Sequence, residues 1–220
     1  MFYQLLIGEL NARTGDAGAA YSLILDAARK QQDPMLYRRA VDIALQARSG
    51  ESALSAAQTW SRDLPGSPDA DRFVLQILLA LNRAAETGPA LTSLLASGDG
   101  VLRDETINAI PQTYSRVSDK ALALQVVKDT LTPYLQGPHA PAAWTTIGRM
   151  ELGLEQPEAA LISARKGHAA NPQSPFPAML ALELVERGQG QRGAEDIVRE
   201  HLRVASPAGP FGSQVPLAYA

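Results

Sequence analysis

The sequence predicts an all-α protein, an α-solenoid of about six antiparallel helix pairs. Three marks that recur with a common period predict this fold. One is an alanine that opens a short apolar segment, and another is a proline that follows most of these alanines at a nearly constant offset. The third is the recurrence of apolar residues in steps of three and four, which is typical of helices and not of strands. The alanines are Ala20, Ala53, Ala90, Ala121, Ala160 and Ala194, and the prolines are Pro34, Pro65, Pro133, Pro172 and Pro207.

The same marks divide the chain into one array of six units. Only the third unit lacks the recurrent proline. We expect residues 208–220 to open a further helix that the C-terminus cuts short. The predicted units cover approximately residues 1–34, 35–66, 67–100, 101–137, 138–173 and 174–207.

The first unit shows how each element of a pair is predicted. Apolar residues at helical spacing occur before and after Gly15-Asp16. A glycine there ends one helix and an aspartate caps the next. Pro34 then stops the second helix and can start another, because its φ is fixed and its backbone N–H is missing. The other units repeat this order of helix, turn, helix and loop.

Small residues are predicted where the two helices of a pair cross. Gly8 precedes Ala20 by the same interval at which Gly148 precedes Ala160. A glycine and an alanine let two helix backbones approach, whereas leucine would force them apart. The other units have Val41, Leu78, Ala109, and Leu180 or Leu182 in place of the glycine.

These residues resemble the tetratricopeptide repeat, a helix-turn-helix unit of about 34 residues. The resemblance implies that the helix pairs stack into a right-handed superhelix. The first unit matches through Ile7, Gly8, Gly15, Ala20, Ile24, Ala27 and Pro34, and the fifth unit matches best, through Trp144, Ile147, Gly148, Ala160, Ala164 and Pro172.

Three opening segments are similar to a narrower group, proteobacterial outer-membrane lipoproteins built from these repeats. They are residues 3–9, Asp33-Pro34 and residues 38–44. That resemblance implies a fragment of a longer lipid-anchored protein on the periplasmic face of the outer membrane, with a cytoplasmic location as the alternative. It also suggests an adaptor for periplasmic carboxy-terminal processing proteases.

Composition excludes several classes of function. With 20 Lys and Arg against 23 Asp and Glu, the chain has a formal net charge of −3. It therefore lacks the basic surface of a nucleic-acid binder. The absence of cysteine from the 220 residues excludes disulfides and thiolate metal sites within them. The longest nearly apolar run, residues 73–81, is too short for direct membrane insertion.

Motifs that carry chemistry all have a structural interpretation, so we predict no enzyme activity, cofactor or metal. Residues 188–193 spell G-x-G-x-x-G, but a helical segment precedes them where the dinucleotide fingerprint needs a strand. Residues 163–166 spell S-x-x-K without its companion motifs. His139, His168 and His201 share no metal-ligand spacing. Asp and Glu occur mainly at turns and on solvated faces, and Trp60 and Trp144 are predicted to be core residues in preference to ligand platforms.

A binding surface is the remaining function, and the resemblance implies where it lies. In tetratricopeptide arrays the first helix of each pair lines the concave face, where an extended peptide binds. The lysine and asparagine clamp that holds a peptide carboxylate in some members is missing, since Leu5, Glu9, Arg38 and Asp42 occupy those positions. The candidate partner-binding residues are Glu9, Arg13, Arg38, Asp42, Asn82, Thr145 and Arg149.

The favoured hypothesis is a non-catalytic scaffold or adaptor with a protein or peptide partner. The alternative is a regulatory repeat domain of a larger enzyme whose catalytic part lies outside these residues. The same surface could also pack against the remainder of a longer chain, and exposed apolar ends leave self-association open.

Overall fold

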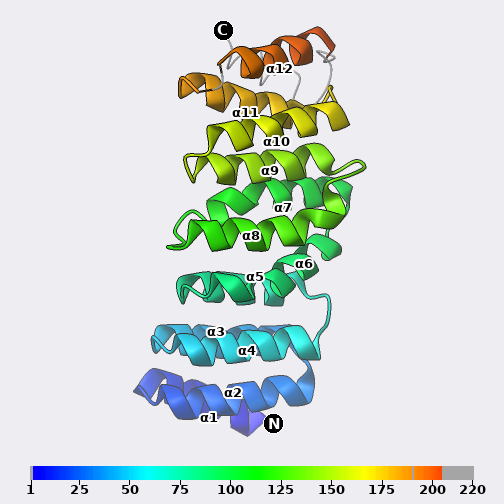
Figure 1. The fold of residues 1–220 in the computed structure, drawn as a ribbon. Coiled ribbons are helices and arrows are strands. Elements are labelled where there is room, and N and C mark those ends of the chain that lie inside the picture. Colours follow the sequence, from blue (N-terminus) through cyan, green and yellow to red (C-terminus); the bar gives the residue numbers. More distant parts are fainter. Residues whose placement is uncertain (1, 190, 205–220) are drawn as a thin grey trace. The chain divides into compact units, whose positions relative to one another are not determined.

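The computed structural model describes residues 2–189 and 191–204. All regular structure in these ranges is helical, as the sequence predicts (Figure 1). The chain divides into two compact units, residues 1–97 (unit 1) and 98–220 (unit 2). Whether all six helix pairs form one superhelical array stays a prediction, as do the boundaries of the six repeats.

Unit 1 contains three helix pairs, and successive helices along the chain pack against one another. The third pair also contains the short 3-10 helix η1 (Ala84–Glu86). The pairs are α1 (Phe2–Thr14) with α2 (Ala17–Gln31), α3 (Pro34–Gln46) with α4 (Gly50–Asp63), and α5 (Pro68–Ala80) with α6 (Gly88–Ser97).

In unit 2, α9 packs with α10 and α11 packs with α12, whereas α7 and α8 each pack against α9 and make few contacts with one another, unlike the pair predicted for residues 101–137. Helix α9 lies at the centre of the unit because it contacts α7, α8, α10 and α11. Pro133 lies in the 3-10 helix η2 (Thr132–Tyr134), ahead of α9. The helices are α7 (Gly100–Thr113), α8 (Lys120–Leu131), α9 (Ala140–Leu152), α10 (Pro157–Ala170), α11 (Pro175–Glu186) and α12 (Gln191–Val204). None of the described helices combines the length and the apolar character needed to span a bilayer.

Local signals start the helices where the sequence predicts them. The carboxylate of Asp16 accepts a hydrogen bond from the Ala19 N–H, and that of Asp33 accepts one from the Met35 N–H. Pro34 is the first residue of α3, where its missing N–H costs no helical hydrogen bond. Pro65 and Pro172 lie in the loops ahead of α5 and α11. Pro207 and residues 208–220 lie outside the described residues.

Buried alanines lie where the helices pack together, and one of the predicted alanine positions is wrong. Ala20, Ala53, Ala160 and Ala194 are fully buried, and Ala90 is nearly so. Ala121 is exposed, so its predicted sealing role is wrong. The physical reason is the helix start: Asp119 caps α8, and the fourth residue after the cap, Ala123, is the buried one. Ala20 after Asp16 and Ala53 after Ser49 occupy that same fourth position.

The two repeat glycines lie at tight crossings of different kinds. A Cβ on Gly148 would lie 3.2 Å from the Cβ of Ser163 and 3.3 Å from the backbone oxygen of Ala160, and would overlap the Leu180 side chain. A Cβ on Gly8 would instead meet the side chain of Ile24 at 2.8 Å. The predicted contact of each glycine with the alanine of its own unit is therefore present in α9 and α10, whereas α1 and α2 use an isoleucine.

Candidate functional site

In unit 1, an ion pair joins the candidate residue Glu9 of α1 to Arg39 of α3, which the sequence did not mark as a candidate. The guanidinium of Arg39 donates two hydrogen bonds of 2.7 Å to the two carboxylate oxygens of Glu9. The hydrogen bonds and charge of Arg39 lower the pKa of Glu9. Arg13 and Arg38 are exposed, and neither makes an ion pair with a described residue. The first helices of this unit therefore present two exposed cations beside one fixed ion pair.

In unit 2, the equivalent bridge joins α9 to α11. Arg149 donates from Nε to Glu183 Oε1 at 2.8 Å, and its Nη2 lies 2.6 Å from the same oxygen. Arg149 is thus held in place and about a quarter exposed, at 23% of its side chain. We call the surfaces that carry these bridges the first-helix face, defined by Glu9, Arg13, Arg38, Arg39 and Asp42 in unit 1 and by Arg149 and Glu183 in unit 2.

Two of the predicted partner-binding residues do not lie on this face. Thr145 is fully buried in α9, so the prediction that it contacts a partner is wrong. Asn82 follows the end of α5 and has a φ of 58°, in the left-handed region that asparagine tolerates. Asn82 therefore belongs to a turn, and its predicted place on the first helix is also wrong.

A hollow of about 190 Å³ lies beside Arg149 in unit 2. Lys120 at the start of α8 and Arg149 supply two cations to its lining, and the lining contains no carboxylate among the described residues. The remaining lining residues are Pro111, Tyr114, Ser115, Ala123, Met150 and Gly153.

A larger hollow of about 330 Å³ lies in unit 2 between the second helices α8 and α10, with α9 as its floor. We call it the Trp144 hollow. At one end, the buried carboxylate of Glu151 accepts a hydrogen bond of 2.7 Å from Ser163 Oγ and lies 2.8 Å from Lys128 Nζ. At the other end, Lys166 Nζ lies 4.3 Å from the centre of the Trp144 ring. Its other lining residues are Asp129, Thr132, Leu135, Ile147, Ala159 and Ile162.

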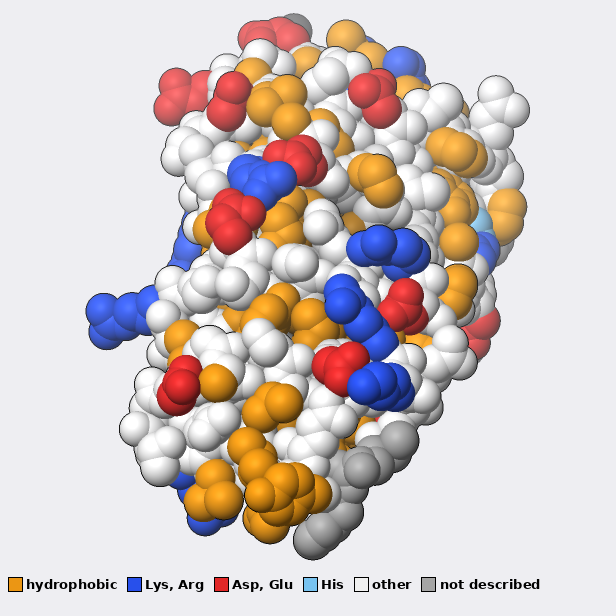
Figure 2. Space-filling model, turned by 90° about the horizontal axis from the view of Figure 1, so that it is seen from below, with side chains coloured by type: hydrophobic (Ala, Val, Ile, Leu, Met, Phe, Trp, Pro, Cys, Tyr) orange, Lys and Arg blue, Asp and Glu red, His pale blue; other side chains and the backbone are white. Residues whose placement is uncertain are grey.

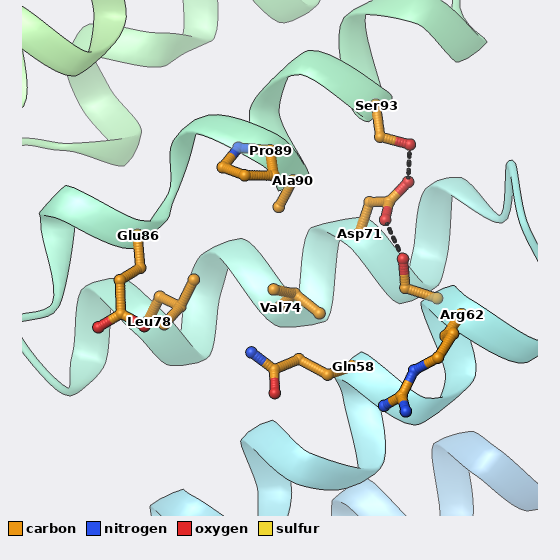
Figure 3. Close-up of a pocket in the computed structure, with 10 residues that line it drawn as sticks. Gln58, Arg62, Asp71, Val74, Leu78, Glu86, Pro89, Ala90 and Ser93 are labelled. Carbon is orange, nitrogen blue, oxygen red and sulfur yellow. Dashed lines mark hydrogen bonds between the residues drawn. The ribbon is translucent and has the colours of Figure 1, made fainter.

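Unit 1 has a hollow of about 300 Å³ at the corresponding place, between α4 and α6 with α5 as its floor (Figure 3). We call it the Asp71 hollow. The buried carboxylate of Asp71 accepts hydrogen bonds from Ser61 of α4 and Ser93 of α6 (Figure 3). The residues of α5 and α6 that line it have counterparts in the Trp144 hollow. Each residue and its counterpart are separated by the same number of positions along the chain. Asp71 corresponds to Trp144, Val74 to Ile147, Leu78 to Glu151, Pro89 to Ile162 and Ser93 to Lys166.

One aspartate–histidine pair in unit 2 has the appearance of a catalytic dyad. Asp104 Oδ1 lies 2.7 Å from His139 Nδ1, and Arg103 Nη1 lies 3.2 Å from His139 Nε2. Because a guanidinium only donates, Nε2 accepts and the Nδ1–H donates to Asp104. The nitrogen that would act as a base already has a partner, so the geometry favours a structural link between α7 and the start of α9.

The S-x-x-K and glycine motifs also have structural partners. Ser163 donates to Glu151 while Lys166 lies over Trp144, so the two members do not act on one another. Gly188 has a φ of 69° and lies in the turn after α11, as the sequence predicts, while Gly190 lies outside the described residues. Within residues 2–189 and 191–204, no group of three metal-ligating side chains could hold a metal ion.

The outward side of α1 carries an apolar strip. Tyr3, Leu6 and Leu10 are 72%, 47% and 52% exposed, and they lie three and four residues apart on one side of the helix. Seen from the α1 end, hydrophobic side chains gather near one edge, beside a mixed group of basic and acidic side chains (Figure 2). Self-association stays a prediction, and this strip is the surface on which we expect it.

No protein-family model and no curated protein matches this chain. Solved structures similar to it include PilW, described as a widely conserved type IV pilus biogenesis factor, with 17% identity, 97% of each chain covered and a TM-score of 0.42. The C-terminal part of a TPR repeat-containing protein from Cytophaga hutchinsonii has 14% identity, 96% and 83% coverage and a TM-score of 0.44. MamA from Desulfovibrio magneticus RS-1 has 18% identity, 78% and 97% coverage and a TM-score of 0.39. All three TM-scores are below 0.5, so the architecture described above stands on the helices of this chain itself.

Sequence reasoning missed the residues that shape the two hollows. The repeat pattern predicts Trp144 in the core, whereas its side chain is only half-buried and forms the wall of a hollow. Nothing in the sequence marks Asp71, Lys128, Glu151 or Lys166, because each is an ordinary charged residue of an amphipathic helix. One sequence feature indicates the difference between the hollows. Asp71 stands in the third repeat at the position that Trp144 occupies in the fifth.

Proposed function

We propose that this chain is a non-catalytic scaffold that binds a protein or peptide partner along the first-helix face. The observation that carries the proposal is the pair of exposed cations, Arg13 and Arg38, beside the fixed Glu9–Arg39 bridge. Exposed charges of this kind steer and orient partners, and a fixed ion pair gives the face a defined shape. A segment that offers carboxylates to Arg13 and Arg38 complements this face.

Unit 2 supports the same interpretation through a different set of groups. The Arg149 guanidinium is held by Glu183, and Lys120 lines the same small hollow. An apolar lining with two cations suits a side chain or backbone segment whose acidic group lies at its edge. The predicted contacts of Glu9, Arg38, Asp42 and Arg149 remain part of this proposal.

The test begins with the immobilised chain and a protein extract, followed by identification of the captured proteins and measurement of affinity with a purified candidate. Arg13→Glu combined with Arg38→Glu should weaken that affinity about tenfold or more, because two attractive contacts become repulsive. A matched double variant, Arg29→Glu with Arg48→Glu, makes the same charge change on α2 and in the turn after α3. Equal affinities of the two double variants would contradict the assignment of the first-helix face.

We also propose, from the sequence resemblance, that the native protein acts at the periplasmic face of the outer membrane beside a processing protease. Cell fractionation of the native gene product, with the protease as a candidate in the binding measurement, tests this setting. Recovery in the cytoplasmic fraction would overturn it and leave the scaffold proposal standing.

A further inference from the structure

We infer a second docking site in unit 2, on the side of the second helices: the Trp144 hollow takes an apolar side chain of a helical protein segment, and an acidic residue one turn away pairs with Lys166. This site goes beyond the proposed function, because α8 and α10 supply its rim whereas the first-helix face lies on α9 and α11.

The first step is the apolar lining. Leu135, Ile147 and Ile162 line the hollow together with the Trp144 ring. Ile162 is 52% exposed in the middle of α10, where much of its side chain gains nothing from packing within the chain. Its burial by a partner would remove apolar surface from water. A volume of about 330 Å³ lies within the range of sites that bind a compact group.

The second step is the rigidity of the floor. The carboxylate of Glu151 is buried, and it is held by Ser163 of α10 and Lys128 of α8. The Trp144 Nε1–H donates a hydrogen bond of 3.1 Å to the Leu135 carbonyl oxygen, which fixes the orientation of the indole. A partner therefore meets a preformed hollow and loses little affinity to ordering it.

The third step is charge. Lys166 lies over the face of Trp144 and makes no ion pair with a described residue. Ile162 and Lys166 are four residues apart, so they lie on one side of α10, one turn apart. A partner helix with a leucine and a glutamate four positions apart presents the complementary pair. The charge of Lys166 selects against a lysine at the second position.

The fourth step is the contrast with unit 1. At the positions of Trp144, Ile162 and Lys166, the Asp71 hollow has Asp71, Pro89 and Ser93. At these positions the Asp71 hollow therefore offers a partner neither the aromatic wall of Trp144 nor the cation of Lys166. Among the described residues, Arg62 of α4 is the cation that lines the Asp71 hollow, and it has no aromatic wall beside it, so the proposed pairing of an apolar side chain with Lys166 is assigned to unit 2.

The test uses 5-fluorotryptophan, because the chain has two tryptophans, one in each unit. Trp60 is buried in unit 1 and serves as an internal reference for folding, whereas Trp144 reports the hollow. The probes are two short amphipathic helical peptides, one with Leu and Glu four positions apart and one with Lys in place of that Glu. The expected result is that the acidic peptide moves the fluorine signal of Trp144 and leaves that of Trp60 in place.

Three variants decide the origin of the signal. Lys166→Glu should weaken binding of the acidic peptide about tenfold and improve binding of the lysine peptide. Ile162→Ser should weaken binding of both peptides. Arg187→Glu, which makes the same charge change in the turn after α11 outside this hollow, should change neither.

No movement of the Trp144 signal with the acidic peptide at about 1 mM, where weak binding is still detected, would overturn the proposal. Equal binding of both peptides to the unmodified chain would do the same. The Arg13→Glu, Arg38→Glu double variant should leave the peptide response unchanged. A failure of the first-helix proposal is therefore distinguishable from a failure of this one.

Discussion

The Asp71 hollow of unit 1 and the Trp144 hollow of unit 2 occupy the same place in their repeats and differ in chemistry. Both lie between two successive second helices, over the first helix that separates those helices in the chain. In unit 1 a buried aspartate links three helices through Ser61 and Ser93. In unit 2 an indole with a lysine over it takes the aspartate's place, and the buried acid, Glu151, lies two turns further along α9.

The comparison teaches that the backbone of the helix pair creates the hollow, whereas single side chains decide what it does. Gln58 of α4 and Lys128 of α8 are each the ninth residue after their N-caps, Ser49 and Asp119. Only the lysine can form an ion pair with an acid. Repeats can thus keep their packing and change their binding chemistry one position at a time.

The largest expected effect comes from Gly148→Leu. Its new side chain would meet Leu180, Ser163 and the Ala160 backbone, and the overpacking should lower the free energy of unfolding by about 3 kcal/mol. Gly8→Leu in unit 1 should cost less, because the first atoms met are the flexible end of Ile24. Urea unfolding measures both, with Gly100→Leu, at an open position, as control. Equal losses at positions 8 and 148 would show that the two crossings do not differ.

The next effect is that of Asp71→Ala. This change leaves the hydroxyls of Ser61 and Ser93 without their acceptor and removes the link between α4, α5 and α6. We expect a loss of about 2 kcal/mol in unfolding free energy. Asp71→Asn keeps an acceptor oxygen and should lose less. A change below the error of the measurement for Asp71→Ala would show that the buried acid does not stabilise unit 1.

A smaller effect is the pH dependence of stability, which should differ between the units because all three histidines lie in unit 2. Burial lowers the pKa of His168; the charge of Glu200 opposes this shift and that of His201 adds to it. The folded state therefore binds fewer protons than the unfolded state, so the stability due to His168 is complete above about pH 6.5 and is lost as the pH falls. His168→Leu should reduce the fall in melting temperature between about pH 7.5 and about pH 5.5. An unchanged fall would assign the pH dependence to other groups.

The smallest effects are those of the two bridges between first helices. Double-mutant cycles of Glu9 with Arg39 and of Arg149 with Glu183 should each give a coupling free energy of about 0.5 to 1 kcal/mol. The pair in unit 2 is less exposed and should be the stronger and the less sensitive to salt. The reverse order would show that side-chain exposure does not control these bridges.

Much of the fold was predictable because its signals are local. Asp16, Asp33 and Pro34 start helices through contacts within a few residues, and the apolar period marks the buried side of each helix. The error at Ala121 has the same local origin, since the Asp119 cap sets the position of the buried residue on α8. Exposure was less predictable: the resemblance implies that Thr145 faces a partner on the first helix of its repeat, but the packing of the helices buries its side chain.

The sequence by itself determined that this protein is a set of helix pairs sealed by alanine and glycine, because capping, turn formation and helical period depend on neighbours along the chain. Tertiary structure alone decided which charges meet. Lys128, Glu151 and Ser163 come from three helices, and Asp71 receives its two serines from two others. Such contacts depend on the register of helices packed side by side, which the spacing of residues along the chain does not specify.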